Sequence, residues 1–244
     1  MQIPGFEVYQ PSTDRSLIIA TSGLQKRGKT HFALTAPGPI AVISLDIGGI
    51  RDVADKFKNK TIYRYEVKKP DKSDNADWKG LLAGIQERYF RVLDNKMVQT
   101  IVMDTGSDMW EIFRMAHLGR LEKVPPLKYT ELNRDFADFI RAAYDSHCNL
   151  ILTHKVKKEY VSKPGSDMGS WNGKYERAGF GDIDFLAQIV LEHDRVTTKD
   201  ENGTPSTEFI VRILDCRINP SVIGMELQGP DMCTFEFLKD LVYA

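Results

Sequence analysis

The eight residues GLQKRGKT at positions 23–30 match the pattern G-x-x-x-x-G-K-[ST] in full. Gly23 and Gly28 allow backbone angles that bend a loop around an anion, so that successive N–H groups point at phosphate. Lys29 can reach the β- and γ-phosphate oxygens of a nucleotide, and the Thr30 hydroxyl can bind Mg²⁺. We therefore predict that one continuous segment binds ATP: Gly23, Leu24, Gln25, Lys26, Arg27, Gly28, Lys29, Thr30 and His31.

A phosphate loop needs a carboxylate at the end of a buried strand to hold the magnesium shell. The apolar run Thr100–Met103 ends at Asp104, which we predict to hold the metal together with Thr30. An alternative role for Asp104 is to cap the helix expected at Met109–His117, and both roles can hold together.

Two further polar residues end neighbouring strands. Thr105, rather than an acid, follows Asp104, so the base that orients water must lie elsewhere, and Asp46 is the best candidate. Asp46 is equally compatible with a turn before Gly48-Gly49, and Asp108 and Glu111 are weaker alternatives. His154 ends the next core strand and could report the γ-phosphate to the segment that follows, with Thr153 as a substitute. The alternative is a purely structural histidine.

The elements that position these residues follow from hydrophobic patterning. Continuous apolar runs predict buried parallel strands at 16–20, 39–45, 100–103 and 149–153. Apolar residues at helical spacing predict amphipathic helices near 78–93 and 132–143. Two intervening βα units fit between Lys29 and Asp104, which favours a sheet with another strand between the two motif strands. Residues 186–227 form a β-rich tail, and Asn202-Gly203 supports a hairpin within it.

Composition excludes several classes of protein. The chain has 244 residues, 42% of them hydrophobic, with a net charge of −1, so any nucleic-acid binding must come from a local patch. The three cysteines, Cys148, Cys216 and Cys233, lack metal-site spacing and suit reduced thiols. The amino-terminal residues lack the pattern of a signal peptide, and no apolar run is long enough to span a membrane. We expect a cytoplasmic protein that forms one domain over residues 1–244, with an irregular lead-in at 1–15.

Five segments, GLQKRGKT, SLDIGG, TIVMD, NLILTHK and IVRILDCRINPSV, together resemble the RecA-like ATPase core. The closest resemblance is to small phage nucleotide-binding proteins that act as RecA-like partners in single-strand annealing recombination, and it covers roughly residues 15–227. It implies an α/β fold with a mainly parallel central sheet flanked by helices and an antiparallel C-terminal extension. It also implies ATP and Mg²⁺ as cofactors, a homo-oligomer (ring or filament), a cytoplasmic location in a phage host, and single-stranded DNA and a single-strand binding protein as partners.

The resemblance also assigns roles to residues. The family's catalytic glutamate maps onto Asp46, its nucleotide sensor onto His154, and one of its two trans-acting basic residues onto Arg217, whereas Asp215 occupies the other position. Its DNA-binding loops map near 119–129 and onto 155–180, which we expect to be a mobile loop. In the second segment, six basic residues against three acidic ones give a local charge of +3, and aromatic residues lie between them. The predicted DNA-binding residues are Lys155, Lys157, Lys158, Lys163, Trp171, Lys174 and Arg177.

Three other functions share part of this pattern. A small-molecule or nucleotide kinase would use the same loop and Asp104, but it needs a lid and an acceptor pocket. A AAA+ motor is disfavoured because such proteins end in a helical lid, whereas this chain ends mainly in strands. A nucleotide-gated binding or assembly module with negligible hydrolysis remains open, because no acid follows Asp104.

Overall fold

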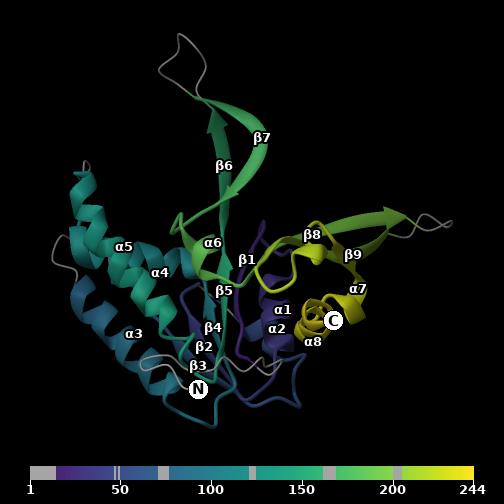
Figure 1. Ribbon diagram of the computed structural model, residues 1–244, viewed down its shortest axis with the longest axis horizontal. Helices are drawn as coiled ribbons and strands as arrows, with labels where there is room; N and C mark the ends of the chain where they lie inside the picture. The colour runs from purple at the N-terminus through teal and green to yellow at the C-terminus, as the bar shows by residue number, and fades with distance from the viewer. Residues whose placement is uncertain are drawn as a thin grey trace, which may run out of the picture.

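An eight-stranded sheet with strand order β10-β9-β8-β1-β5-β4-β2-β3 forms the centre of the computed structural model (Figure 1). The structure describes residues 15–46, 48, 50–70, 77–120, 125–161, 169–199 and 205–244. The irregular lead-in expected at 1–15 therefore lies outside the described residues except for Arg15.

The parallel part of the sheet carries the predicted motifs. It consists of β1 (Ile18–Ser22), β2 (Ile40–Ser44), β3 (Ile62–Glu66), β4 (Thr100–Asp104), β5 (Asn149–His154) and the first residues of β8 (Ile189–Lys199). Every residue of β1, β2, β4 and β5 is buried, as expected for strands covered on both faces. β5 lies between β1 and β4, so the predicted separation of the two motif strands is confirmed.

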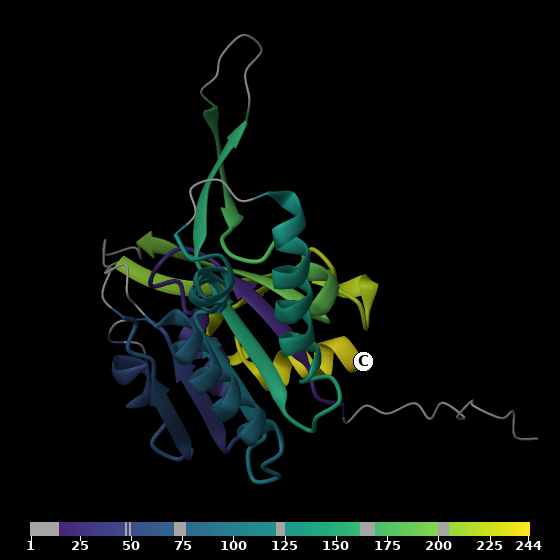
Figure 2. The same cartoon turned by 90° about the vertical axis from the view of Figure 1, so that its left-hand side faces the viewer.

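Helices cover both faces of this sheet (Figure 2). One face packs on α1 (Lys29–Thr35), α2 (Arg51–Ala54) and α8 (Phe235–Tyr243), and we call it the α1 face. The other face packs on α3 (Trp78–Leu93), α4 (Gly106–Leu118), α5 (Pro126–Arg141) and α6 (Ile183–Leu186). Successive strand residues alternate between the two cores, so Ile19 belongs to the α1 face and Ala20 to the opposite face.

The predicted β-rich tail contains an antiparallel extension of the same sheet. β8 pairs along its length with β9 (Pro205–Cys216), which pairs in turn with β10 (Glu226–Gln228). A 3₁₀ turn at Pro220–Val222 lies between β9 and β10, and the short helix α7 (Gly229–Met232) connects β10 to α8. We call residues 194–199 of β8, which extend beyond its pairing with β1, together with their partners 205–210 of β9, the β8–β9 arm.

The described residues of the segment 155–180, which we expected to be a mobile loop, include the two paired strands of a β-hairpin. β6 (Val156–Val161) and β7 (Ser170–Arg177) form a separate two-stranded antiparallel sheet that stands away from the main body (Figure 1). The two strands form cross-strand pairs, such as Lys158 with Tyr175 and Tyr160 with Trp171, and their register shifts between these two pairs. The density of charge and glycine in the sequence obscured this pairing.

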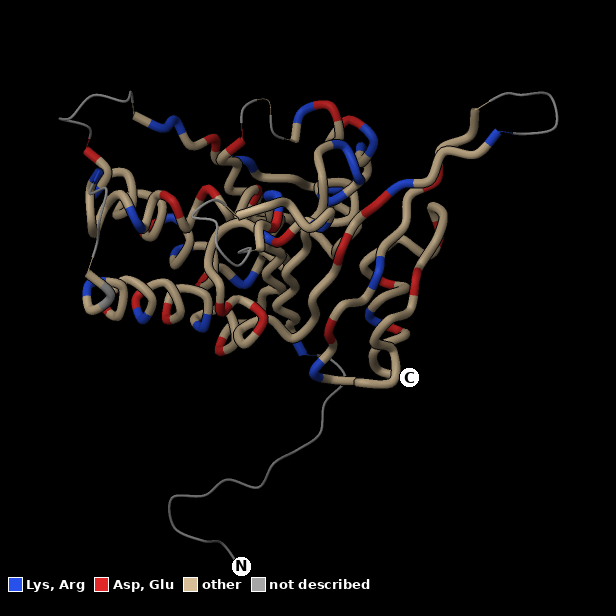
Figure 3. Tube along the Cα trace, turned by 90° about the horizontal axis from the view of Figure 1, so that it is seen from above, with Lys and Arg blue, Asp and Glu red and all other residues tan. Residues whose placement is uncertain are grey.

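Charged residues are spread over the described part of the chain. Basic and acidic positions are interleaved along most elements (Figure 3), in keeping with the net charge of −1. In the part of the chain that the structure describes, no helix is both long and apolar enough to cross a membrane. All three cysteines are buried and free.

Candidate functional site

The phosphate loop connects β1 to α1 and has the backbone that its glycines were expected to provide. Gly28 has φ +91° and Gly23 has φ +149°, conformations that side chains rarely adopt. A Cβ atom on Gly23 would also lie 2.4 Å from the backbone oxygen of His193 in β8. Gly23 is therefore required both by its own conformation and by the close approach of β8.

Lys29 lies at the start of α1 with its ammonium group turned back onto the loop. Its Nζ donates hydrogen bonds to the backbone oxygens of Gly23, at 2.7 Å, and Leu24, at 2.8 Å. Burial lowers the pKa of Lys29, while the carboxylates of Asp104 and Asp46 act in the opposite direction. Lys29 is therefore positioned inside the curve of the loop, where it can exchange two carbonyl partners for phosphate oxygens.

Two hydroxyl groups connect Asp104, at the end of β4, to the start of α1 and to the neighbouring strand β5. Thr30 Oγ1 donates to Asp104 Oδ2 at 3.1 Å, and Thr153 Oγ1 donates to Oδ1 at 2.5 Å. The side chains of Asp104 and Thr153 share the α1 face because the two residues are register partners on adjacent parallel strands. The predicted pair of metal-binding residues, Thr30 and Asp104, is thus brought together across 74 positions of sequence.

The electrostatics of this carboxylate suit a divalent cation. Burial raises the pKa of Asp104 above its ordinary value, although the hydrogen bonds from Thr153 and Thr30 oppose the shift. A buried carboxylate gains from a nearby positive charge, and Mg²⁺ prefers oxygen ligands. The oxygens of Thr30 and Asp104 therefore fit Mg²⁺, which when bound would neutralise charge on the β- and γ-phosphates.

Asp46 follows β2 at the same edge of the sheet. Its carboxylate is exposed, and it acts electrostatically on both Lys29 and Asp104. Ser44, two residues earlier, is the register partner of Asp104. Asp46 is thus near the predicted metal and phosphate positions, and its role as the base stays a prediction.

His154 does not face the phosphate site, contrary to the position expected of it, and its role as a nucleotide sensor stays a prediction. It is completely buried on the face opposite α1, where its Nδ1 lies 3.4 Å from Ser107 Oγ. Its Nε2 has no hydrogen-bond partner among the described residues. Burial, reinforced by the nearby Arg177, lowers the pKa of His154 to about 3, so the ring is neutral. The preceding residue, Thr153, is the one that contacts Asp104, because successive strand residues point to opposite faces.

Arg217 lies at the opposite edge of the sheet from the phosphate loop. Its backbone N–H donates to Gln188 just before β8 begins, and its guanidinium donates to the Tyr144 hydroxyl at 3.2 Å and to the Phe185 carbonyl. Arg217 therefore takes no part in the site of its own chain. Whether it reaches the nucleotide of a neighbouring subunit stays a prediction.

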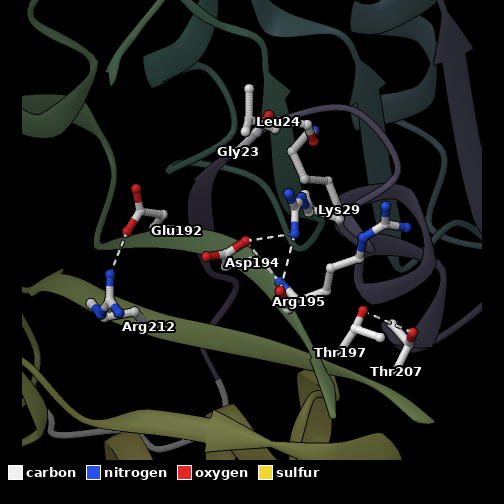
Figure 4. Close-up of polar contacts among 10 residues, drawn as sticks. Gly23, Leu24, Lys29, Glu192, Asp194, Arg195, Thr197, Thr207 and Arg212 are labelled. Atoms are coloured by element: carbon white, nitrogen blue, oxygen red, sulfur yellow. Dashed lines mark hydrogen bonds and ion pairs between the residues drawn. The ribbon is translucent and has the colours of Figure 1, made fainter. Parts of the chain in front are cut away.

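The β8–β9 arm packs against the phosphate loop, a contact that no sequence motif indicates. Arg27 pairs with the Asp194 carboxylate at 2.9 Å and donates to the backbone oxygen of Arg195 at 3.0 Å. Figure 4 shows Gly23 and Lys29 beside this part of β8, with Thr197 and Thr207 further along the arm. Asp194 could not be recognised from sequence, because its partner in the loop is 167 positions away and matches no motif.

The β6–β7 hairpin presents aromatic residues on one surface. Lys158, Tyr160, Trp171 and Tyr175 occupy directly opposed positions, and we call them the aromatic face. Tyr160 is 60% exposed, Trp171 46% and Tyr175 42%. Lys158 Nζ lies 4.8 Å from the Trp171 ring centroid, and the Trp171 and Tyr175 rings are 6.0 Å apart.

The predicted DNA-binding cations divide into two groups. Lys155, Lys157 and Arg177 are engaged in ion pairs with Asp108, Glu176 and Asp184, respectively. Lys158 belongs to the aromatic face, and Lys174 is exposed on β7. Lys163 lies outside the described residues. The ion pairs reduce the charge that the segment can offer to a ligand, so a count of basic residues overstates it.

The first turn of α4 joins the hairpin to the metal-binding strand. Ser107 Oγ accepts a hydrogen bond from the Lys155 backbone N–H at 3.0 Å and donates one to the Ala178 carbonyl at 2.7 Å. Asp108 pairs with Lys155 and Lys69; burial alone would raise the pKa of Asp108, but these partners lower it. Lys155 and Ala178, at the two ends of the hairpin, are therefore held by Ser107 and Asp108, which follow Asp104 by three and four residues.

Comparison with known proteins agrees with this geometry. A family model described as "AAA domain" matches residues 15–195, which run from β1 into β8 and include the loop, Asp104 and the β6–β7 hairpin. No curated protein matches the chain. The match supports an AAA-type family for this chain. We had disfavoured an AAA+ motor, because the chain ends mainly in strands and such motors end in a helical lid. After β8, the described residues form the strands β9 and β10 and only short helices, so the predicted strand-rich C-terminal part is present. Because the family model matches most of its length and includes the G-x-x-x-x-G-K-[ST] motif, the chain belongs to the AAA-domain family of nucleotide-binding P-loop proteins.

Proposed function

We propose that this protein is a RecA-like ATPase that hydrolyses ATP with Mg²⁺ and binds single-stranded DNA through the β6–β7 hairpin. One observation carries the nucleotide part of the proposal: Thr30, Asp104 and Thr153 form a continuous hydrogen-bonded link from the phosphate loop across the sheet. A capping role for Asp104 would not require contact with the loop.

The residues of the site have separate tasks in this proposal. Lys29 exchanges the carbonyls of Gly23 and Leu24 for phosphate oxygens, and it stabilises the charge that develops on them. Thr30 and Asp104 hold the metal. Asp46 orients the attacking water, because it is the exposed carboxylate that acts on both Lys29 and Asp104.

The aromatic face supports the DNA part of the proposal. Aromatic side chains stack on unpaired bases without regard to sequence, at about 1–3 kcal/mol for each base. Lys158 lies at the same surface, where its charge can meet a phosphate. The polar contacts of Ser107 at the hairpin root provide a route by which the Asp104 strand and the hairpin influence one another.

Assembly belongs to the proposal as well. A homo-oligomer, as a ring or a filament, would allow the exposed Arg217 to approach the nucleotide of a neighbouring subunit and stabilise charge there. A single-strand binding protein and a phage host cytoplasm are expectations that come with the family resemblance.

Steady-state ATP hydrolysis, assayed with and without single-stranded DNA, tests the proposal. We expect magnesium-dependent turnover that DNA increases, and we expect Lys29→Ala to reduce it at least about 100-fold, since its charge stabilisation is lost. Lys96→Ala, which changes an exposed lysine at the opposite edge of the sheet, is the matched control and should keep full activity.

Other outcomes identify the competing functions. ATP binding without turnover would favour a nucleotide-gated module, in agreement with Thr105 in place of an acid after Asp104. Phosphate transfer to an added acceptor would favour a kinase. Absence of any ATP binding would overturn the proposal altogether.

A further inference from the structure

The order of strands sets the direction in which a nucleotide lies across the phosphate loop. This inference rests on the proposed ATP site. Asp104 and Thr153 lie on β4 and β5, to one side of β1, whereas β8 and β9 lie to the other side. The metal and the terminal phosphates belong beside Asp104. The nucleoside must therefore leave the loop toward solvent, toward α2 or toward the β8–β9 arm.

The arm carries an exposed aromatic ring at the edge of the loop. A Cβ atom on Gly28 would lie 3.1 Å from the ring of Phe209, so ring and loop are in close contact. Phe209 alternates with Val211 and Ile213, which pack in the core of the α1 face, so its side chain lies on that same face. The ring is nevertheless 42% exposed.

A structural purpose does not account for this exposure. A ring that served only to support the loop would gain most from complete burial, as Phe32 of α1 does at 1% exposure. Arg195 is the register partner of Phe209 and shares its face, and it adds a cation at the same edge. Arg27 fixes the arm against the loop through Asp194, so the ring has a defined position relative to the phosphates.

We propose that Phe209 is the stacking platform for the base of the bound nucleotide, and that the β8–β9 arm thereby selects a nucleoside triphosphate over inorganic polyphosphate. β9 lies beyond residues 15–195, so the family match does not include this ring. The rival position is the His31–Phe57 pair beside α2, whose ring centroids are 5.1 Å apart.

Isothermal titration calorimetry with two probes, ATP and inorganic tripolyphosphate, each with Mg²⁺, tests the proposal. Phe209→Ala should weaken ATP binding about tenfold, as expected for one lost stacking contact, and should leave tripolyphosphate binding within about twofold. Phe209→Leu keeps apolar volume against Gly28 without a flat ring and should give the same selective loss, whereas Phe209→Tyr should bind as the wild type does. Val196→Ala, an exposed apolar residue on the opposite face of the same arm, is the control.

The outcomes separate this inference from the function on which it rests. Equal losses for ATP and tripolyphosphate, or unchanged ATP binding in Phe209→Leu, would overturn the stacking role and leave the ATP site intact. A selective loss of ATP binding in Phe57→Ala instead would also overturn it. A wild-type protein that binds neither probe would overturn the proposed function itself.

Discussion

Two hairpins leave the same edge of this molecule, and they are attached to it in different ways. The β8–β9 arm continues the main sheet and contacts the phosphate loop through Arg27, Asp194 and Phe209. The β6–β7 hairpin is a sheet of its own, held at its root by Ser107 and Asp108. The first hairpin contacts the phosphate loop directly, whereas the second is held at its base by the start of α4 and continues from the end of β5.

The difference indicates which hairpin can move without disturbing ATP. A displacement of the arm would break the packing of Phe209 on Gly28 and reshape the loop. A displacement of the β6–β7 hairpin would first break the contacts of Ser107 and Asp108 at its base, none of which involves a residue of the phosphate loop. We therefore expect mutations in the first hairpin to affect nucleotide binding and those in the second to affect DNA binding.

Removal of the β6–β7 hairpin should have the largest effect. Replacing residues 156–177 with a short glycine–serine turn is feasible, because the Ala178 N–H already donates to the Lys155 carbonyl at 2.8 Å. We expect affinity for single-stranded DNA, measured by fluorescence anisotropy, to fall at least about 100-fold as several stacking contacts are lost. ATP affinity should stay within about twofold. A large loss of ATP binding in this variant would contradict the separation of the two hairpins.

Gly23→Ala should have an intermediate effect, and it should weaken the binding of nucleotide but not the binding of DNA. The new Cβ would meet the His193 backbone oxygen at 2.4 Å in a backbone conformation unfavourable for alanine, at a cost of about 1–3 kcal/mol. We expect ATP affinity to fall about tenfold and the melting temperature to decrease, by calorimetry. Gly181→Ala, where a Cβ would meet nothing within 4 Å, is the control. Unchanged ATP binding in Gly23→Ala would show that β8 does not constrain the loop.

Charge reversal at two adjacent lysines should give the smallest effect and sharpen the map of the DNA surface. Lys158 belongs to the aromatic face, whereas Lys157 is paired with Glu176 at 3.2 Å. Lys158→Glu should weaken DNA binding about five- to tenfold and reduce its salt dependence, because a phosphate contact is lost. Lys157→Glu should weaken it about twofold at matched salt. Equal effects would show that net charge, rather than the aromatic face, determines binding.

Much of the core could be predicted from the sequence. The strands that carry the phosphate loop and Asp104 are continuous apolar runs, and the glycine-framed motif has a specific pattern, so both were recognisable. The spacing of the two motifs also predicted that another strand separates β1 from β4 in the sheet, and β5 is that strand.

The errors have physical reasons. His154 and Thr153 are adjacent in sequence but face opposite cores, and the exact register of β5 decides which one meets Asp104. The β6–β7 hairpin has charges on both faces, so its two-residue alternation is weak. The contacts of Asp194 and Phe209 join segments far apart in sequence, and no local pattern carries that information.

The Ser107 hydroxyl has a mechanical consequence for the hairpin above it. This one oxygen is hydrogen-bonded to the backbone just before β6, at Lys155, and just after β7, at Ala178, so the two strands cannot separate at their base without breaking at least one of these bonds. We therefore expect the hairpin to follow the start of α4 as one unit, so that a small shift of that turn is enlarged along the length of the two strands.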